Sequence, residues 1–354
     1  MLIARAPVRI SLAGGGTDLP AYYEQYGGMV VSTTIDKYFH AFVTLTETDG
    51  VEISSSDYRV FYRHRGGQPP LWDGDLGLVK AALHQFDCER GISLFLASQV
   101  PPGTGLGSSS SVAVALVKAL GTLKGLSLHA AQVAERACRL ELDMLRSPIG
   151  KQDQFAAAFG GLNAITFSRD SIRVEAIALS RQILSQLQKN LLLFFTGGAR
   201  MANSILKHQQ DATSTGQPDT VAALHAIKEA AMETKHCLET GNLRRFGEVL
   251  GETWEQKKQL APGVTNARID ELYDLARKNG ALGGKLAGAG GGGFLMLYCE
   301  ESSQAAMTQA LEDAGLYRMD YQFERGGAQV LMNALPRNIS RWPGSERERQ
   351  LQYA

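Results

Sequence analysis

The sequence predicts an α/β protein of two domains, or one large α/β unit. Its 354 residues suffice for two hydrophobic cores, and 44% hydrophobic with 20% charged residues is an ordinary globular composition. Apolar runs with strand-like alternation recur between runs with helical periodicity along the chain. Three glycine-rich segments, near the start, at one third and near the end, each adjoin such a run.

The charge balance and the cysteine content limit the kinds of partner and cellular location that we expect. Lys plus Arg and Asp plus Glu number 36 each, and no dense basic run is present, so we expect no nucleic-acid partner. The four cysteines form no C-x-x-C pair, which favours reduced thiols over disulfides or a zinc site. No apolar run has the length of a signal peptide core or of a membrane span, roughly 18 residues. We expect a cytoplasmic protein without a membrane partner.

The first part of the chain predicts an antiparallel sheet. Residues 2–12 alternate as a strand and enter the turn AGGGTDLP, where Thr17 and Asp18 are placed to cap a helix beginning near Pro20. That turn is either a tight capped connection or a site for a phosphate or a sugar. Residues 59–74 are polar and predict a loop. The remaining elements expected here are strands at 29–35, 38–46, 51–55 and 92–97 and a helix at 75–86.

The segment VPPGTGLGSSSSVAVALV, residues 100–117, predicts an anion site. Gly103, Gly105 and Gly107 let backbone N–H groups approach an anion, and a run of four serines then opens an apolar helix with free N–H groups at its start. A dinucleotide fingerprint does not fit, because prolines precede the loop and no acid follows at the required distance. The Walker pattern also fails, since Leu286 follows Gly284 and Lys285. A triphosphate cradle is the interpretation that remains besides an ordinary turn.

Two acidic residues follow this segment. On a helix over 129–146, Glu141 falls on the apolar face and Glu135 on the opposite face. A buried glutamate is costly unless a cation meets it, so Glu141 is either a Mg²⁺ ligand or a satisfied position at the rim of the core. Asp153 begins a short helix in GKQDQFAAAFGG, residues 150–161, where it has a site role or only complements the helix dipole.

The second half predicts a further sheet with helices. A strand at 191–196 follows a polar helix that begins near Ser180. The glycine run GGKLAGAGGGG, residues 283–293, directly precedes a strand at 294–298, which argues against a floppy linker. A strand at 328–333 is expected to close this domain. The other expected elements are strands at 162–167 and 172–177 and helices at 201–212, 219–240, 243–259, 266–279 and 302–314.

The three glycine-rich segments together resemble the GHMP kinase superfamily. APVRISLAGGGTD resembles its first motif, PPGTGLGSSSS its second and KLAGAGGGG its third, in order and over essentially the whole chain. The resemblance implies a domain like the second domain of ribosomal protein S5 over residues 1–187 and a ferredoxin-like domain over 188–335. A charged tail, residues 336–354, follows. ATP is expected between the two domains.

The resemblance also implies individual roles. Asp153 is the expected catalytic carboxylate beside Arg9, Ser109 and Glu141 are the expected Mg²⁺ ligands, and Arg200 is either the cation for a distal substrate phosphate or a surface arginine. The expected ATP contacts are Pro102, Gly103, Thr104, Gly105, Leu106, Gly107, Ser108, Ser109 and Ser110. The expected substrate contacts are Gly15, Gly16, Thr17, Asp18, Gly288, Ala289 and Gly290.

The implied activity is an ATP- and Mg²⁺-dependent sugar kinase acting on the anomeric hydroxyl, as a monomer or a homodimer. LAGGGTD and GKQDQFAAAFGG resemble the kinases of D-glycero-D-manno-heptose 7-phosphate, while the GGG of residues 14–16 departs from the G-E-H of galactokinases and implies a different sugar. The alternatives are a kinase for L-fucose or galactose, a non-catalytic sugar and nucleotide sensor, and an isoprenoid-pathway kinase or decarboxylase. Arg9, where mevalonate kinases carry Lys, speaks against the last.

Overall fold

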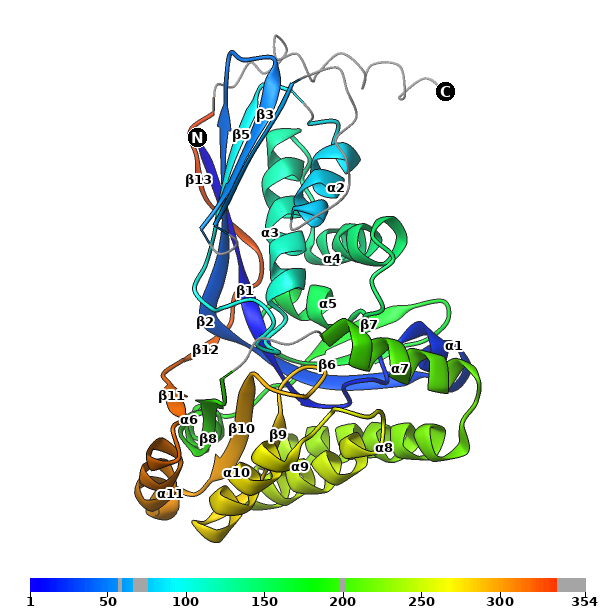
Figure 1. Ribbon diagram of the computed structural model, residues 1–354, viewed down its shortest axis with the longest axis vertical. Helices are drawn as coiled ribbons and strands as arrows, with labels where there is room; N and C mark the ends of the chain where they lie inside the picture. The colour runs from blue at the N-terminus through cyan, green and yellow to red at the C-terminus, as the bar shows by residue number, and fades with distance from the viewer. Residues whose placement is uncertain (57–58, 66–75, 89, 198–201, 336–354) are drawn as a thin grey trace.

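Two β-sheets with their helices make up the protein in this computed structural model, which describes residues 1–56, 59–65, 76–88, 90–197 and 202–335 (Figure 1). The described part of the first sheet has nine strands. Its main path runs β13-β1-β2-β5-β3-β4; β6 and β12 also pair with β2, and β7 pairs with β6. Its strands are β1 (Leu2–Ala13), β2 (Gly28–Leu45), β3 (Gly50–Ser55), β4 (Val60–Arg65), β5 (Ile92–Ser98), β6 (Leu162–Phe167), β7 (Ile172–Ala176), β12 (Phe323–Glu324) and β13 (Gln329–Asn333).

Strand β2 is a single strand of 18 residues, whereas the sequence predicts two strands with a break after Ile35. The register between β1 and β2 shifts between Pro7 and Val8, at the level of Asp36 and Lys37. A bulge bends a strand without ending it, so Asp36 and Lys37, which separate the two predicted strands, lie within β2. As a result β2 pairs with β6 at one end and with β5 at the other.

The predicted loop at residues 59–74 is wrong in its first part. Strand β4 pairs with β3 in an antiparallel hairpin, from Val60 opposite Ser55 to Arg65 opposite Gly50. The aromatic and β-branched residues at the start of β4 favour a strand, but the basic residues that follow them give the segment a polar composition. The part of that loop from residue 66 onward lies outside the described residues.

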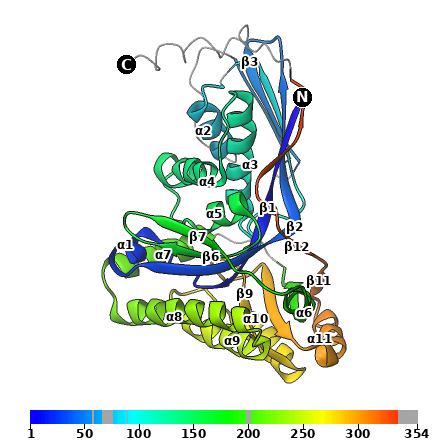
Figure 2. The ribbon, with the colours of Figure 1, turned by 180° about the vertical axis from the view of Figure 1, so that it is seen from behind.

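Helices cover one face of the first sheet (Figures 1 and 2). The central one, α3, packs along β1 and β2 and is buried over most of its length. The predicted helix at 129–146 is an α-helix followed by a π-helix, and its faces are as predicted, because Glu141 is buried and Glu135 is exposed. The helices are α2 (Gly77–Gln85), α3 (Ser108–Leu123), α4 (Ala130–Cys138), the π-helix η1 (Arg139–Met144) and α5 (Gln152–Phe159).

The second sheet is antiparallel, with the strand order β11-β8-β10-β9. Numbered within this unit, that is the order 4-1-3-2 of a β-α-β-β-α-β chain, which confirms the predicted ferredoxin-like topology. Its strands are β8 (Leu191–Phe195), β9 (Ala281–Leu286), β10 (Phe294–Cys299) and β11 (Tyr317–Met319). The helices of this half are α6 (Arg181–Asn190), α7 (Ala202–Ser214), α8 (Pro218–Thr240), α9 (Leu243–Lys258), α10 (Ala267–Lys278) and α11 (Glu301–Asp313).

The last strands differ from the prediction. The glycine run begins inside β9, because Gly283 and Gly284 pair with β10 rather than forming a loop. The short strands β11 and β12 carry too little pattern to be predicted. Strand β13, predicted to close the second domain, instead pairs with β1 at the edge of the first sheet. The chain therefore returns to the first sheet after completing the second.

The two sheets share one apolar cluster. Val8 and Ile10 of β1 belong to it, together with Leu193 of β8 and Met296 of β10. This shared core fixes the facing ends of the two halves, where the glycine-rich segments lie. Among the helices that the structure describes, none is both long and apolar enough for a membrane span.

Candidate active site

A cavity of about 260 Å³ lies where the three glycine-rich segments meet. Fifteen of the residues predicted for the site line it, from both halves of the chain. They are Arg9, Gly15, Gly16, Asp18, Gly103, Gly105, Gly107, Ser108, Ser109, Ser110, Glu141, Asp153, Gly288, Ala289 and Gly290. Their convergence from five separate stretches of sequence makes this cavity the candidate active site.

The second glycine-rich segment forms a loop that ends at α3. Gly103, Gly105 and Gly107 have φ of 74°, 86° and 71°, in the left-handed region that favours glycine. Gly107 is the N-cap of α3, and no side chain caps the helix. The N–H groups of its first turn, beside Ser108 and Ser109, are therefore available to an anion.

Three residues of this segment do not line the cavity. Thr104 is fully buried, and its hydroxyl donates to the carbonyl of Pro101 at 2.9 Å. Leu106 is also fully buried, and its carbonyl accepts the N–H of Arg9 at 3.0 Å. Pro102 is likewise absent from the residues that line the cavity. The predicted ATP contacts at these three positions therefore do not come from residues that line the cavity.

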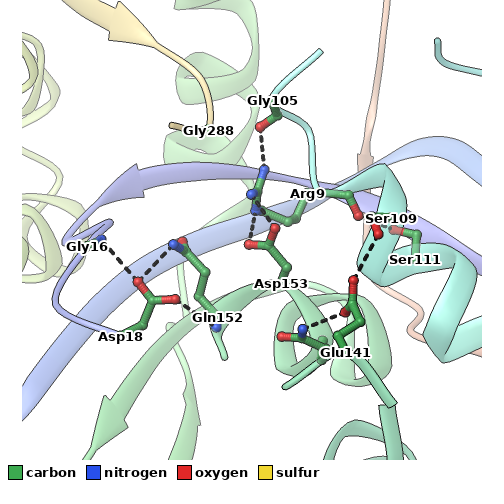
Figure 3. A network of polar contacts seen from close by, with 12 residues as sticks. Arg9, Gly16, Asp18, Gly105, Ser109, Ser111, Glu141, Gln152, Asp153 and Gly288 are labelled. Atoms are coloured by element: carbon green, nitrogen blue, oxygen red, sulfur yellow. Dashed lines mark hydrogen bonds and ion pairs between the residues drawn. The ribbon is translucent and has the colours of Figure 1, made fainter. Parts of the chain in front are cut away.

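Arg9 and Asp153 form a two-point ion pair in the cavity (Figure 3). Arg9 Nε and Nη2 donate to the two carboxylate oxygens of Asp153 at 2.7 and 2.6 Å. Nη1 of Arg9 donates to the carbonyl of Gly105 at 2.6 Å, which ties the pair to the glycine loop. Arg9 comes from β1 and is 4% exposed, whereas Asp153, in the first turn of α5, keeps 22% of its side chain exposed. The carboxylate is thus held in one orientation and is still accessible.

Asp18 does not cap the next helix, contrary to the prediction. Helix α1 (Pro20–Tyr26) has Leu19 at its N-cap without a side-chain hydrogen bond. The carboxylate of Asp18 instead accepts from the N–H of Gly16 at 3.0 Å and from the N–H and Nε2 of Gln152 at 3.1 and 3.0 Å. Burial, and then the charge of Asp153, raise the pKa of Asp18. The turn therefore presents Asp18 to the cavity.

Thr17 faces away from the cavity. Its hydroxyl donates to the carbonyls of Gly14 and Met29 and accepts the N–H of Met29, so it holds the turn against β2. The polar atoms of Thr17 are occupied, and its predicted contact with a substrate has no support in this arrangement.

Ser109 and Glu141 meet on the other side of the cavity. The Ser109 hydroxyl donates to one carboxylate oxygen of Glu141 at 2.9 Å, and Gln154 Nε2 donates to the other at 2.6 Å. Burial raises the pKa of Glu141 to about 7 despite these hydrogen bonds and one from Ser110. A buried carboxylate in this state is stabilised when a cation joins it.

Comparisons with known proteins extend this picture. The family model for the GHMP kinases N terminal domain matches residues 76–161, and the model for their C terminal domain matches residues 229–315. The D-glycero-alpha-D-manno-heptose 7-phosphate kinase of Campylobacter jejuni is 31% identical over 331 residues, which are 92% of this chain and 97% of that protein. The chain belongs to the GHMP kinase family. Membership makes it a kinase, an ATP-dependent phosphotransferase.

Two further relatives of this GHMP kinase act in sugar chemistry. The crystal structure of a D-glycero-D-manno-heptose 1-phosphate kinase from Bacteroides thetaiotaomicron superposes with a TM-score of 0.78 at 29% identity, covering 95% of this chain and all of that one. The L-fucokinase/L-fucose-1-P guanylyltransferase of Bacteroides fragilis is 28% identical over 338 residues, 85% of this chain and 35% of that protein.

The residues around Glu141 fit the magnesium ion that kinases use. In the described residues, no three His, Cys, Asp or Glu side chains gather as a metal site, so the protein supplies few ligands of its own. Mg²⁺ is usually held by one or two carboxylates together with substrate phosphates and water. Ser109 and Glu141 offer oxygen donors beside the start of α3, which matches that pattern.

The third glycine-rich segment packs directly on the second. A Cβ added at Gly105 would lie 2.4 Å from the carbonyl oxygen of Ala287, and one at Gly288 would lie 2.6 Å from the Cα of Gly105. Only glycine permits this approach of backbone to backbone. Gly288, Ala289 and Gly290 thereby line the cavity next to the second glycine-rich segment.

Several residues that line the cavity were not predicted from the sequence, and the polar ones among them include Ser11, Gln152, Gln209, Lys257 and Lys285. Gln152 and Lys285 lie inside two of the quoted motifs, GKQDQFAAAFGG and GGKLAGAGGGG. Their positions beside Asp153 and Gly284 were the signal that could have identified them. Gln209 and Lys257 lie on amphipathic helices, where nothing in the sequence distinguishes them from surface residues. Arg200, predicted to hold a distal phosphate, lies outside the described residues.

Proposed function

We propose that this GHMP kinase transfers the γ-phosphoryl group of ATP, with Mg²⁺, to the anomeric hydroxyl of a sugar. We propose D-glycero-D-manno-heptose 7-phosphate as the sugar, which would give the 1,7-bisphosphate. The observation that carries the proposal is the accessible carboxylate of Asp153, fixed by Arg9 between an anion-binding loop and a cluster of hydroxyl-binding groups. A kinase needs these three parts in one cavity.

Asp153 acts on the acceptor hydroxyl in this proposal. It accepts the proton of the anomeric hydroxyl while the sugar oxygen bonds to the γ-phosphorus and the bond from that phosphorus to the bridging oxygen of ADP breaks. Arg9 holds both oxygens of Asp153, so the carboxylate keeps its orientation during the transfer. The N–H groups of the glycine loop and of the first turn of α3 hold the phosphates.

Magnesium, when bound at Ser109 and Glu141, would neutralise negative charge on the phosphates. The donor set of a hydroxyl and a buried carboxylate supports this assignment. The loop residues Gly103, Gly105, Gly107, Ser108 and Ser110 line the same cavity and are the proposed phosphate contacts.

Unpaired polar atoms support a substrate with many hydroxyl groups. Ser11 Oγ, Gln152 Oε1 and Gln209 Nε2 are buried without a hydrogen-bond partner in the described residues, and all three residues line the cavity. Buried polar atoms are costly unless paired, and sugar hydroxyls both donate and accept. We assign these atoms, with Asp18 and the turn at Gly15 and Gly16, to the sugar.

We also propose a division of the chain at residues 187 and 188, with residues 336–354 as a tail. The second sheet supports the division, although β12 and β13 lie beyond it in sequence and pair with the first sheet. A cytoplasmic location fits the four cysteines, which are buried and free. For the assembly we propose a monomer or a homodimer.

The test is ADP release with Mg²⁺ and ATP on a panel of heptose 7-phosphate, sedoheptulose 7-phosphate, L-fucose, galactose and mevalonate. We expect the highest kcat/KM with heptose 7-phosphate. A higher kcat/KM with L-fucose would leave the proposed phosphorylation of an anomeric hydroxyl in place and would replace heptose 7-phosphate by L-fucose as the substrate. Turnover of mevalonate alone, or of no compound in the presence of tight sugar and nucleotide binding, would refute the proposal in favour of an isoprenoid kinase or a sensor.

A further inference from the structure

Lys285 is a buried cation whose charge nothing in the described chain matches. It lies in β9, opposite Met296 of β10, and is 3% exposed, yet it lines the cavity. The structure gives its ammonium no hydrogen-bond or ion-pair partner within the described residues. A lysine this deeply buried is costly unless a partner meets its charge.

Two other cations lie close to Lys285. Burial, and then the charges of Lys257 and Arg9, hold the pKa of Lys285 well below its usual value. Arg9 is taken by Asp153 and by the carbonyl of Gly105. Lys257, on α9, donates to the carbonyls of Leu286 and Gly288 at 2.8 and 2.5 Å. Lys285 is therefore the member of this group of three cations that has no acceptor in the described chain.

The carboxylates of the cavity are taken by other donors. Asp153 is bound to Arg9, Asp18 to Gln152 and the N–H of Gly16, and Glu141 to Ser109 and Gln154. An anionic ligand in the cavity would supply the acceptor that the ammonium of Lys285 lacks in the described chain.

The position of Lys285 indicates which ligand group it meets. Lys285 lies two residues before Ala287, just past the end of β9, and both residues line the cavity. The carbonyl of Ala287 abuts Gly105 of the anion-binding loop. Lys285 thus lines the cavity near the contact between the second and third glycine-rich segments and close to Arg9.

We propose that Lys285 binds a phosphate oxygen of a ligand in the cleft. The phosphate is either the γ-phosphate of ATP or the phosphate that the sugar already carries, and both share the chemistry of a dianion that accepts a charge-assisted hydrogen bond. The sugar source rests on the proposed function, whereas the nucleotide source does not. Lys257 holds Gly288 through the hydrogen bond to its carbonyl, and its positive charge opposes that of Lys285 until an anion binds.

The test compares Lys285→Met with wild type for four ligands, all with Mg²⁺ where a nucleotide is used. The ligands are ADP, a nonhydrolysable ATP analogue, D-glycero-D-manno-heptose 7-phosphate and the same heptose without phosphate. Lys285→Arg keeps a positive charge, and Lys278→Met removes an exposed lysine at the end of α10 as the matched control. Dissociation constants and thermal midpoints are measured for each protein.

We expect Lys285→Met to raise the dissociation constant of either the ATP analogue or the phosphorylated sugar by about ten- to one-hundredfold. The dissociation constant of the matching ligand without that phosphate, ADP or the unphosphorylated heptose, should stay within about twofold of the wild-type value. The ligand that weakens identifies the source. Lys285→Arg should retain more of that affinity than Lys285→Met. Unliganded Lys285→Met should melt no lower than wild type, because an unpaired buried charge has been removed.

An equal loss for all four ligands, no loss for any, or a lower thermal midpoint that Lys278→Met does not share would overturn the inference and make Lys285 a structural residue. Failure of the proposed function gives a different pattern. Wild type then turns over no sugar, but Lys285→Met still binds the ATP analogue more weakly than wild type does while the two proteins bind ADP equally well.

Discussion

Asp153 is the residue on which the proposed chemistry depends. Both of its oxygens are bound by Arg9, so replacement by asparagine keeps the shape and removes the group that accepts the proton. We expect Asp153→Asn to lower kcat by about a hundredfold to ten thousandfold, the usual contribution of a general base, with ATP affinity kept within a few fold. Steady-state kinetics and nucleotide titration measure the two quantities.

The matched control is Asp170→Asn, which changes an exposed aspartate in the turn between β6 and β7. It should keep the wild-type rate. If Asp153→Asn retained most of its activity, Asp153 would lose its proposed role.

Lys257 should make the stability of the protein rise with pH. Burial, and then the charge of Arg9, lower the pKa of Lys257 from 10.5 to about 7. Between these two values the unfolded chain binds a proton that the folded chain does not, so the free energy of unfolding increases with pH, by at most about 1.4 kcal/mol per pH unit for one group. Below pH 7 both states are charged and the contribution is constant.

Urea unfolding at pH 7, 8 and 9 measures this dependence. Wild type should gain stability over the range, and Lys257→Met should gain less, with Lys285 accounting for part of what is left because its pKa is lowered in the same direction. Equal slopes for the two proteins would mean that Lys257 does not titrate in this range.

At the scale of elements, the contact between the two glycine-rich walls is testable with a matched pair of substitutions. Gly105 and Gly125 have φ of 86° and 72°, so alanine is strained at both. A Cβ at Gly105 would lie 2.4 Å from the backbone oxygen of Ala287, whereas one at Gly125 meets nothing within 4 Å. The difference between the variants therefore isolates the contact from the strain.

We expect Gly125→Ala to cost about 1–2 kcal/mol of stability and to leave ATP binding unchanged. Gly105→Ala should lower the thermal midpoint further and weaken ATP binding, because the loop has to move away from the backbone of Ala287. Calorimetry and nucleotide titration report the two effects. Equal thermal midpoints and equal ATP affinities for the two variants would show that the contact between Gly105 and Ala287 does not determine the conformation of the anion-binding loop.

Elements differ in how well sequence predicts them. The loop before α3 and the helix itself follow from glycines, serines and an apolar run, and Glu141 on the buried face follows from helical spacing. The single strand β2 could not be predicted, since a bulge at Asp36 and Lys37 resembles a turn in a local pattern. The carboxylate of Asp18 accepts hydrogen bonds from Gln152 instead of from the first N–H groups of the next helix. The choice between these partners depends on tertiary contacts, which a local sequence pattern does not contain.

At the scale of the whole molecule, the return of the chain to the first sheet was beyond sequence reasoning. A strand at 328–333 has a clear pattern, but its partner β1 lies at the other end of the chain, and no local signal names it. More of the candidate site than of this topology could be predicted, because most of the predicted site residues lie in short sequence motifs. Lys257 and Gln209 were missed because a cavity between two halves recruits residues from helices whose pattern concerns only their own packing.

The returning segment packs against the helix that carries Asp153. A Cβ at Gly160, which ends α5, would lie 2.1 Å from the backbone of Gly326, and Ala328 donates its N–H to the carbonyl of Ala158. Removal of residues 326–354 takes away these contacts and β13. We expect this truncation to lower the thermal midpoint strongly and to abolish activity.

A shorter truncation after Leu335 serves as the control. It keeps β13 and the packing of Leu335 on the core of the first sheet, so we expect near wild-type kinetics and melting. Loss of activity in the shorter truncation would assign a role to residues 336–354, which the sequence predicts to be a charged tail.

The central claim, that the cavity at Asp153 phosphorylates an anomeric hydroxyl, is tested most directly by the structure of the product. ³¹P NMR of a reaction with ATP, Mg²⁺ and D-glycero-D-manno-heptose 7-phosphate should show ADP forming together with a new phosphate signal coupled to the anomeric proton, and Asp153→Asn should yield neither. A new phosphate on any other hydroxyl, or ATP consumption without a phosphorylated sugar, would contradict the account.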